Sequence, residues 1–239
     1  MAEDLEAAKE AAARFAVERF VRAKDRIALG TGSTAAHAVR ALAARFPDRE
    51  IQCVASSAAT EELARSLGLA VRELRGDDRF DRMLDGADEV APSLDLTKGA
   101  GGALFREKFL ARLTGEVVIL VDPTKLVAAL GERHRVPVEV VPFARPVVER
   151  KVAARGHRPR LRVLPDGRPF RTDNGNEILD LAPPSPLFEP AAEERALREI
   201  PGVVETGLFI GLAHRVVVGH ADGRVEERVR PGAGRRSPD

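Results

Sequence analysis

Between residues 84 and 109 the chain gathers side chains that can move protons and bind charged groups. Asp85 and Asp88 follow an apolar run, and carboxylates in that position could bind sugar hydroxyls, shuttle protons or hold magnesium. Lys98 begins a bare loop that precedes a predicted helix, Lys98-Gly99-Ala100-Gly101-Gly102. An ammonium group there would place a compact positive charge where backbone can approach a ligand closely. The alternatives are solvated acids beside a turn at Asp85-Gly86 and a solvated lysine beside a flexible loop.

Glu107 lies one turn into the helix that is predicted to follow this loop, near Leu104, Phe105 and Phe109. Burial among these apolar side chains would favour proton uptake by the carboxylate, which a general base requires. A glutamate beside a lysine in a helix is usually a surface residue, however. The pattern alone therefore leaves a catalytic and a surface interpretation of Glu107 open.

A second glycine-containing turn, Gly30 to Ala35, has the form G-x-G-x-x-A between a predicted strand and a predicted helix. A dinucleotide site would also need an acid at the end of the next strand, where this chain has Ala55-Ser56-Ser57. Thr31, Gly32, Ser33 and Thr34 instead suit a phosphate at a helix N-terminus. The alternative is that Ser33 or Thr34 only caps the helix. A P-loop is excluded because no Gly-Lys-Ser/Thr follows.

The elements that must position these residues alternate between helix and strand through the first half of the chain. Hydrophobic periodicity predicts helices over 4–22, 34–46, 59–67 and 103–113, and strands over 26–30, 51–57, 70–74, 82–86 and 116–122. This alternation predicts the α/β class with a doubly wound, Rossmann-like, mostly parallel sheet. In such a sheet, sites form at the carboxyl ends of the strands.

The second half of the chain has a different sequence pattern. It contains extended runs interrupted by prolines and two turn signals, Asp166-Gly167 and Asn174-Gly175. It predicts helices at 144–155 and 190–200 and a meander of antiparallel strands, which together form a second, smaller α+β lobe. A hairpin is predicted around Asp222-Gly223. We expect a catalytic domain from residues 1–131 plus 204–229, a lobe from 132–203 and a disordered tail at 230–239.

Composition excludes several classes of function. No window of the 239 residues is apolar for long enough to span a membrane, and the acidic start is unlike a signal peptide, so a cytoplasmic location is expected. The single cysteine, Cys53, fits a buried strand, and the five histidines form no cluster at metal-ligand spacing. A net charge of +1 and 4% aromatic residues argue against a nucleic-acid surface.

Taken together, the motifs resemble the ribose-5-phosphate isomerase type A family. The matching segments occur in family order from about residue 9 to 228, and they are GTGSTAAHAV, SSAATEELARSLGL, DGADEV, KGAGGALFREK, VDPTKLV, VPVEVVPFAR, TDNGNEILDL and IPGVVETGLF. The resemblance implies interconversion of D-ribose 5-phosphate and D-ribulose 5-phosphate in the non-oxidative pentose phosphate pathway. It also implies that the chain needs no metal or organic cofactor and forms a homodimer or homotetramer.

Carried over by position, the resemblance implies a catalytic set and a substrate-binding set. The catalytic residues would be Glu107, Asp85, Lys98 and Asp88. The substrate-binding residues would be Thr31, Gly32, Ser33, Thr34, Asp85, Gly86, Ala87, Asp88, Lys98, Gly99, Ala100, Gly101 and Lys125. Two positions depart from the family pattern, since Phe105 stands where a small polar residue is usual and Ala100 where glycine is usual.

The hypothesis that follows gives each residue type a role. Glu107 moves the carbon-bound proton, Asp85 assists ring opening and Lys98 stabilises the developing oxyanion. Asp88 orients sugar hydroxyls, and the hydroxyls at 31–34 with Lys125, and more weakly Lys9, hold the phosphate. Glu89 and Asp95 are interpreted as bystanders. The competing interpretations are a sugar-phosphate sensor, which would normally carry a DNA-binding module, and an amino-sugar-phosphate deaminase or lactonase.

Overall fold

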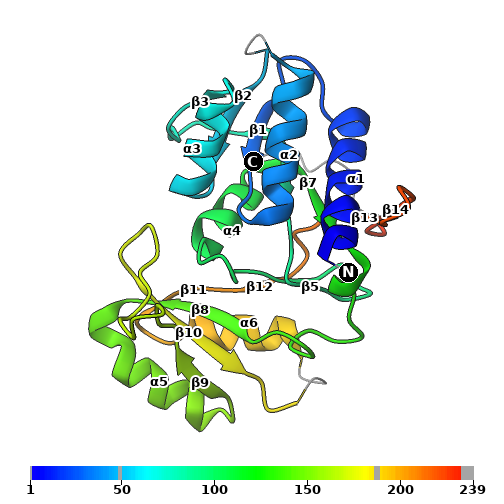
Figure 1. Cartoon of the computed structure of the whole chain (residues 1–239). Coiled ribbons are helices and arrows are strands. Elements are labelled where there is room, and N and C mark those ends of the chain that lie inside the picture. Colours follow the sequence, from blue (N-terminus) through cyan, green and yellow to red (C-terminus); the bar gives the residue numbers. More distant parts are fainter. Residues whose placement is uncertain (1, 48–49, 186–188, 233–239) are drawn as a thin grey trace. The chain divides into compact units, whose positions relative to one another are not determined.

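The computed structural model describes residues 2–47, 50–185 and 189–232 (Figure 1). It divides into two compact units. Unit 1 comprises Met1–Ala87, Arg106–Lys125 and Gly211–Asp239, and unit 2 comprises Asp88–Phe105 and Leu126–Ile210. This division differs from the predicted one, because residues 88–105, 126–131 and 204–210 group with unit 2. From residue 233 on, the predicted tail lies outside the described residues.

Unit 1 contains a seven-stranded sheet in the order β14-β13-β7-β4-β1-β2-β3. Its strands are β1 (Arg26–Leu29), β2 (Gln52–Ala55), β3 (Ala70–Val71), β4 (Phe80–Asp85), β7 (Thr114–Val121), β13 (Arg215–Gly219) and β14 (Val225–Val229). All neighbouring pairs are parallel except the β13–β14 hairpin. The order reverses between β1 and β4, so the doubly wound sheet that the sequence predicts is confirmed.

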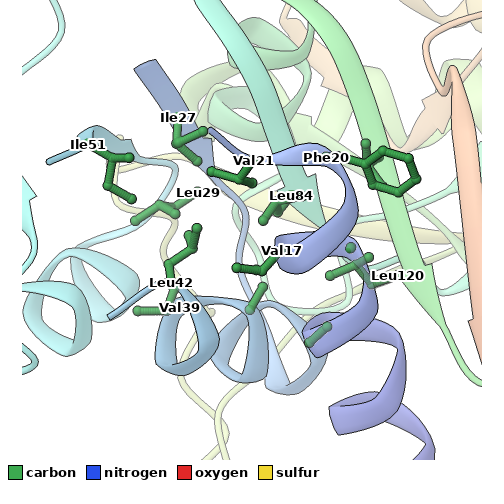
Figure 2. Packing of buried hydrophobic residues seen from close by; sticks show 14 of the residues in the cluster. Val17, Phe20, Val21, Ile27, Leu29, Val39, Leu42, Ile51, Leu84 and Leu120 are labelled. Carbon is green, nitrogen blue, oxygen red and sulfur yellow. The ribbon is translucent and has the colours of Figure 1, made fainter. Parts of the chain in front are cut away.

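Helices α1 (Ala2–Phe20), α2 (Ser33–Arg45) and α3 (Ala58–Ser66) of unit 1 pack apolar side chains against this sheet. Unit 1 also contains the main part of α4 (Leu104–Arg112) and the 3-10 turn η1 (Pro123–Lys125), which buries no residue. Figure 2 shows Val17 of α1 and Leu42 of α2 among Leu29, Leu84 and Leu120 of the strands. Burying each of these side chains contributes roughly 1.5–3 kcal/mol.

Small residues let α1 approach β13 closely. A Cβ atom added at Gly219 would lie 2.0 Å from the backbone oxygen of Ala8, so only glycine fits at this strand position. Ala12 is fully buried in the same core. The alanine-rich sequence of α1 therefore serves close packing as well as helix propensity.

Cys53 is fully buried in β2, as predicted. Burial raises the pKa of its thiol to about 12, because a thiolate would lose its hydration there. The residue acts as a small apolar side chain in the core, and its thiol is inert at neutral pH.

Unit 2 contains a four-stranded antiparallel sheet in the order β11-β8-β10-β9 and a three-stranded sheet in the order β12-β6-β5. The strands are β5 (Glu89–Val90), β6 (Leu96–Thr97), β8 (Val136–Val140), β9 (Arg158–Leu161), β10 (Glu177–Ala182), β11 (Val203–Thr206) and β12 (Leu208–Phe209). The helices are η2 (Pro142–Ala144), α5 (Arg145–Ala154) and α6 (Pro190–Arg198). The predicted smaller α+β lobe is thus confirmed.

Side chains along β8 alternate between the two faces of the sheet, and those on one face form the core of unit 2. Val136, Val138 and Val140 share one face of the strand and pack with Val148 of α5 and Leu197 of α6. The small sheet explains why residues 88–105 group here, because β6 pairs with both β5 and β12. Such long-range pairing is not visible in local periodicity.

Within the described residues, no helix is both long and apolar enough to cross a membrane. The predicted turns are present, with Gly167, Gly175 and Gly223 all at positive φ. The predicted strand at 70–74 is shorter than expected and covers only Ala70–Val71.

Candidate active site

The carboxyl ends of β1 and β4 lie next to each other where the strand order of unit 1 reverses. The amide of Gly30 donates to the carbonyl of Leu84 at 2.9 Å. A Cβ atom at Gly30 would lie 2.0 Å from the Asp85 carboxyl carbon, so this position requires glycine. Asp85 is fully buried, and its Oδ1 accepts the amide N–H groups of Thr31 at 3.2 Å and Gly86 at 2.7 Å. Asp85 therefore ties the turn at Gly30 to Ala35 to the turn at Asp85-Gly86.

The Thr31 hydroxyl faces a cluster of hydroxyl groups at the end of β2. Its Oγ1 lies 2.7 Å from the Ser56 hydroxyl and 2.9 Å from that of Ser57. Thr60 closes the cluster by donating to the Gly30 carbonyl at 3.0 Å. The segment Ser56-Ser57-Ala58-Ala59-Thr60 matches a family motif but contains none of the predicted site residues. Its hydroxyls shape the turn that the sequence predicts to bind a phosphate.

Ser33 and Thr34 occupy the first two positions of α2. Gly32 is the N-cap with φ +110°, and the helix has no side-chain cap. The alternative that either hydroxyl caps the helix is therefore wrong. Ser33 is exposed and Thr34 half-buried, and a Cβ atom at Gly86 would lie 3.5 Å from that of Thr34. The hydroxyls, the helix dipole and the β4 loop thus meet at the switch point of the sheet.

Lys125 reaches the same edge of the sheet from β7, the neighbour of β4. It ends η1, which begins after the buried Asp122. The Asp122 carboxylate accepts the backbone N–H of Thr124 at 2.9 Å and also its hydroxyl. This turn fixes the backbone that carries the half-buried Lys125.

Lys9, the weaker phosphate candidate, is engaged elsewhere. Its ammonium donates to Glu6 at 2.6 Å, and His37 lies 2.9 Å from the other Glu6 oxygen. Hydrogen bonds from Lys9 and His37 lower the pKa of Glu6 to about 2. The Lys9 ammonium is therefore already paired with a carboxylate of its own helix, that of Glu6.

Glu107 and Lys108 are both buried on α4, with exposed fractions of 3% and 1%. The interpretation of Glu107 as a surface residue is therefore wrong. Phe109 is the exposed member of this segment, at 44%. An apolar residue faces solvent while two ionisable groups are buried, which is the reverse of ordinary helix amphipathicity.

In unit 2 the predicted glycine loop is tightly held. Lys98 is 3% exposed, so its interpretation as a solvated lysine is wrong. Its Nζ lies 5.5 Å from the centre of the Phe209 ring, and its amide donates to the Gly207 carbonyl at 2.9 Å. Gly99 has φ +106°, and a Cβ atom there would lie 2.9 Å from that of Leu104.

Asp88 braces this loop. Its amide donates to the Thr97 carbonyl at 2.8 Å, and its Oδ2 accepts the Ala100 N–H at 2.9 Å. Ala100 and Gly101 are exposed at the tip of the loop. Alanine in place of the usual glycine at position 100 therefore leaves the tip of the loop exposed to solvent.

Arg162 is a functional candidate that the sequence reasoning missed. Its Nη1 donates to the carbonyls of Gly99 and Ala100, each at 2.9 Å. Asp180 binds the same guanidinium at 3.0 and 2.5 Å, and the Phe170 ring lies 5.8 Å below it. Phe170 also fills the space where Gly102 lacks a side chain. Arg162 therefore fixes the carbonyl orientation of the loop that Lys98 begins.

Glu89, interpreted from sequence as a bystander, is a fully buried structural carboxylate. Its Oε1 accepts the amides of Arg133 at 2.6 Å and His134 at 2.8 Å. Its Oε2 accepts the Gly131 amide at 2.6 Å and the Thr97 hydroxyl at 3.2 Å. The carboxylate therefore ties the segment 131–134 to β5 and β6.

The predicted residues thus fall into two well-formed groups. Unit 1 brings together Thr31, Gly32, Ser33, Thr34, Asp85, Gly86, Ala87 and Lys125 at the carboxyl edge of its sheet, and it carries Glu107 on α4. Unit 2 brings together Asp88, Lys98, Gly99, Ala100 and Gly101. Among the described residues, no group of three His, Cys, Asp or Glu side chains could hold a metal ion.

A doubly wound sheet with hydroxyls at a helix N-terminus and carboxylates at its switch point is the architecture of an α/β enzyme. The family model of ribose 5-phosphate isomerase A (phosphoriboisomerase A) matches residues 52–223. The chain belongs to this isomerase family, as the sequence motifs predicted.

Individual relatives match over nearly their whole length. The chain is 48% identical over 228 residues to ribose-5-phosphate isomerase A of Thermomicrobium roseum, covering 94% of this chain and 95% of the relative. A solved ribose 5-phosphate isomerase A of Methanocaldococcus jannaschii has a TM-score of 0.86 at 36% identity and covers 92% of this chain and 97% of its own. A D-ribose-5-phosphate isomerase in complex with phospho-erythronic acid has a TM-score of 0.89 at 35% identity, with coverages of 95% and 100%.

Proposed function

We propose that this chain interconverts D-ribose 5-phosphate and D-ribulose 5-phosphate through an enediolate, without a metal or organic cofactor. The observation that carries the proposal is the buried Glu107 on α4, the helix that opens just after the Lys98 loop, in a chain of this family. We place the reaction in the non-oxidative branch of the pentose phosphate pathway, in the cytoplasm. The working form is a homodimer or homotetramer.

The phosphate is held by the N-terminus of α2 and by Lys125. Gly32, Ser33 and Thr34 offer backbone N–H groups, hydroxyls and the positive end of a 13-residue helix dipole. Lys125 adds a full positive charge from η1. Because the phosphate is remote from the reacting carbons, its binding energy serves to position them.

Glu107 is the base that moves the carbon-bound proton. It removes the proton from C2 of the open-chain aldose, and the electron pair forms the C1–C2 double bond, which leaves the negative charge of the enediolate on the C1 oxygen. The acid form of Glu107 then returns its proton to C1, while the C2 hydroxyl passes its proton to the C1 oxygen through Asp85 and becomes the ketone. One carboxylate can serve both carbons, as a glutamate does in the known case of triosephosphate isomerase.

Lys98 stabilises the negative charge that develops on the substrate oxygens, and its burial strengthens that interaction. Asp88 orients sugar hydroxyls and keeps the loop in shape through the Ala100 amide. Asp85 assists ring opening and hydroxyl proton transfer, while its bonds to the Thr31 and Gly86 amides hold the phosphate loop.

Phospho-erythronic acid, the ligand of a solved relative, provides a probe for this proposal. Its carboxylate is planar and negatively charged, as the enediolate is, and its phosphate suits the α2 site. We propose that it binds this chain as a competitive inhibitor. An inhibition constant below the Michaelis constant for ribose 5-phosphate would agree with transition-state-like binding.

A coupled assay tests the function directly. Purified protein receives ribose 5-phosphate, and ribulose 5-phosphate is detected with and without a chelator. We expect turnover that the chelator leaves unchanged. Absence of turnover would refute the isomerase proposal, and loss of turnover with chelator would refute the metal-free mechanism.

Lys98→Ala should lower kcat by about 10²–10³-fold and raise KM much less, because the ammonium acts on charge that exists only in the transition state. Steady-state kinetics of the variant measure this split. Lys151→Ala removes an exposed lysine from α5 and serves as the charge-matched control. An effect of Lys98→Ala confined to KM would assign Lys98 to ground-state binding.

Arg162→Ala should lower kcat/KM by about 10-fold to 10²-fold, mainly through kcat, because the Gly99–Ala100 peptides lose their fixed orientation. Arg160→Ala, an exposed position two residues earlier, is the control. Partial rescue by Arg162→Lys would support carbonyl binding as the cause. Unchanged kinetics in Arg162→Ala would show that the loop keeps its shape without the clamp.

A further inference from the structure

A polar cavity of about 310 Å³ lies at the opposite, amino-terminal edge of the unit 1 sheet. Four arginines, one glutamate and one histidine contribute to its lining: Arg19, Arg22, Arg82, Arg215, Glu116 and His214. None of these residues has a role in the proposed isomerisation. Cavities that bind small molecules begin at about this volume.

The floor of the cavity is a rigid charged network. Glu116 binds Arg215 at 2.5 Å and Arg82 at 2.9 Å. Arg215 also pairs with Glu227 and lies 5.2 Å from the centre of the Phe20 ring. Because these contacts fix both guanidinium groups, a ligand would meet donors that are already in place.

Positive charge exceeds negative charge around this floor. Four guanidinium groups line the cavity, whereas the described residues place three carboxylates beside them: Glu116, Glu227 and Asp25, which accepts the Arg22 backbone N–H at 2.9 Å. Arg82 has a side chain only 8% exposed, and its guanidinium pairs with Glu116 and donates to the Asp81 carbonyl. In the part of the chain that the structure describes, Arg19 and Arg22 are exposed and have no carboxylate side-chain partner. The excess is therefore about one positive charge, and it lies at the cavity mouth with Arg19 and Arg22.

The geometry points to a second anion site, which we propose binds a small phosphate-bearing molecule. Planar guanidinium groups match phosphate oxygens in pairs, and a group of arginines on a fixed floor suits a dianion better than a monoanion. The site is separate from the candidate active site. From Glu116 to Val121, β7 spans about 17 Å between the two edges of the sheet.

Pyrophosphate titration by calorimetry tests the site, with wild type compared against Arg19→Ala/Arg22→Ala. We expect the double variant to lose one equivalent of pyrophosphate per chain, or to bind that equivalent at least tenfold more weakly. Lys125→Ala removes a cation from the candidate active site and should retain the equivalent. This comparison distinguishes the new site from phosphate binding during isomerisation.

Arg14→Ala/Arg40→Ala removes two exposed arginines elsewhere in unit 1 and is the charge-matched control, which should bind as wild type does. Circular dichroism checks that each variant folds, and Arg22→Glu replaces the double variant if the latter melts early. Equal pyrophosphate binding by wild type and the variants at Arg19 and Arg22 would overturn the proposal. An equal loss in the Arg14/Arg40 control would also overturn it, because general charge would then explain the binding.

Discussion

Replacing Glu107 by glutamine should leave the protein folded and reduce turnover by about 10²-fold or more, the magnitude expected for loss of a general base. Glutamine has nearly the same size as glutamate, so it fits the buried position on α4, but it cannot accept the C2 proton. Steady-state kinetics with ribose 5-phosphate measure the loss. Phospho-erythronic acid should still bind within a few-fold of wild type, because the phosphate site is untouched.

Two further variants sharpen this test. Glu107→Asp keeps the acid but moves it back by one methylene group, so its turnover should lie between those of wild type and Glu107→Gln. Glu62→Gln makes the same chemical change at an exposed position on α3 and should have no effect. Near-normal turnover in Glu107→Gln would remove Glu107 from the mechanism.

Glu89→Gln should lower the free energy of unfolding by about 3–5 kcal/mol, the range for removing one partner from a buried charged network. The amide retains one oxygen acceptor, but its NH₂ group would face N–H donors that the carboxylate now satisfies. Urea denaturation followed by circular dichroism measures the change. A separate early transition for unit 2 would have the same cause.

Glu132→Gln is the matched control for this stability test. Glu132 lies in the same segment and accepts one N–H group, that of Ala128 at 2.9 Å, but it is exposed. Its substitution should cost about 1 kcal/mol or less. A similar small cost for Glu89→Gln would mean that the 131–134 segment does not depend on the buried carboxylate.

Much of the fold was predictable because local periodicity follows burial in unit 1. Residues 26–30 and 82–86 are short apolar runs between helical periods, and they form β1 and β4 on either side of the switch point. The division into units was not predictable in this way. Residues 88–105 contain strands of only two residues each, and their grouping depends on pairing with β12, more than a hundred residues further along.

The candidate site, too, was only partly predictable from local sequence patterns. Glycine loops and acids at strand ends are sequence signals, and Asp85 and Lys98 were found from them. Arg162 lies in an arginine-rich stretch without any such signal, and only the folded chain shows its bonds to the Gly99 and Ala100 carbonyls. Glu89 was interpreted as a bystander to catalysis, and its structural role was not predictable because its backbone donors come from about forty residues away.

The contact of α1 with β13 bears on how this chain is made. Gly219 meets Ala8 across about 210 residues of sequence, so that contact of the first helix cannot form until the last parallel strand has left the ribosome. At roughly 5–20 residues per second, this delay is on the order of 10–40 seconds. During that time α1 exposes part of its alanine-rich face to chaperones and proteases. Strand β13 therefore determines when this face of α1 becomes protected.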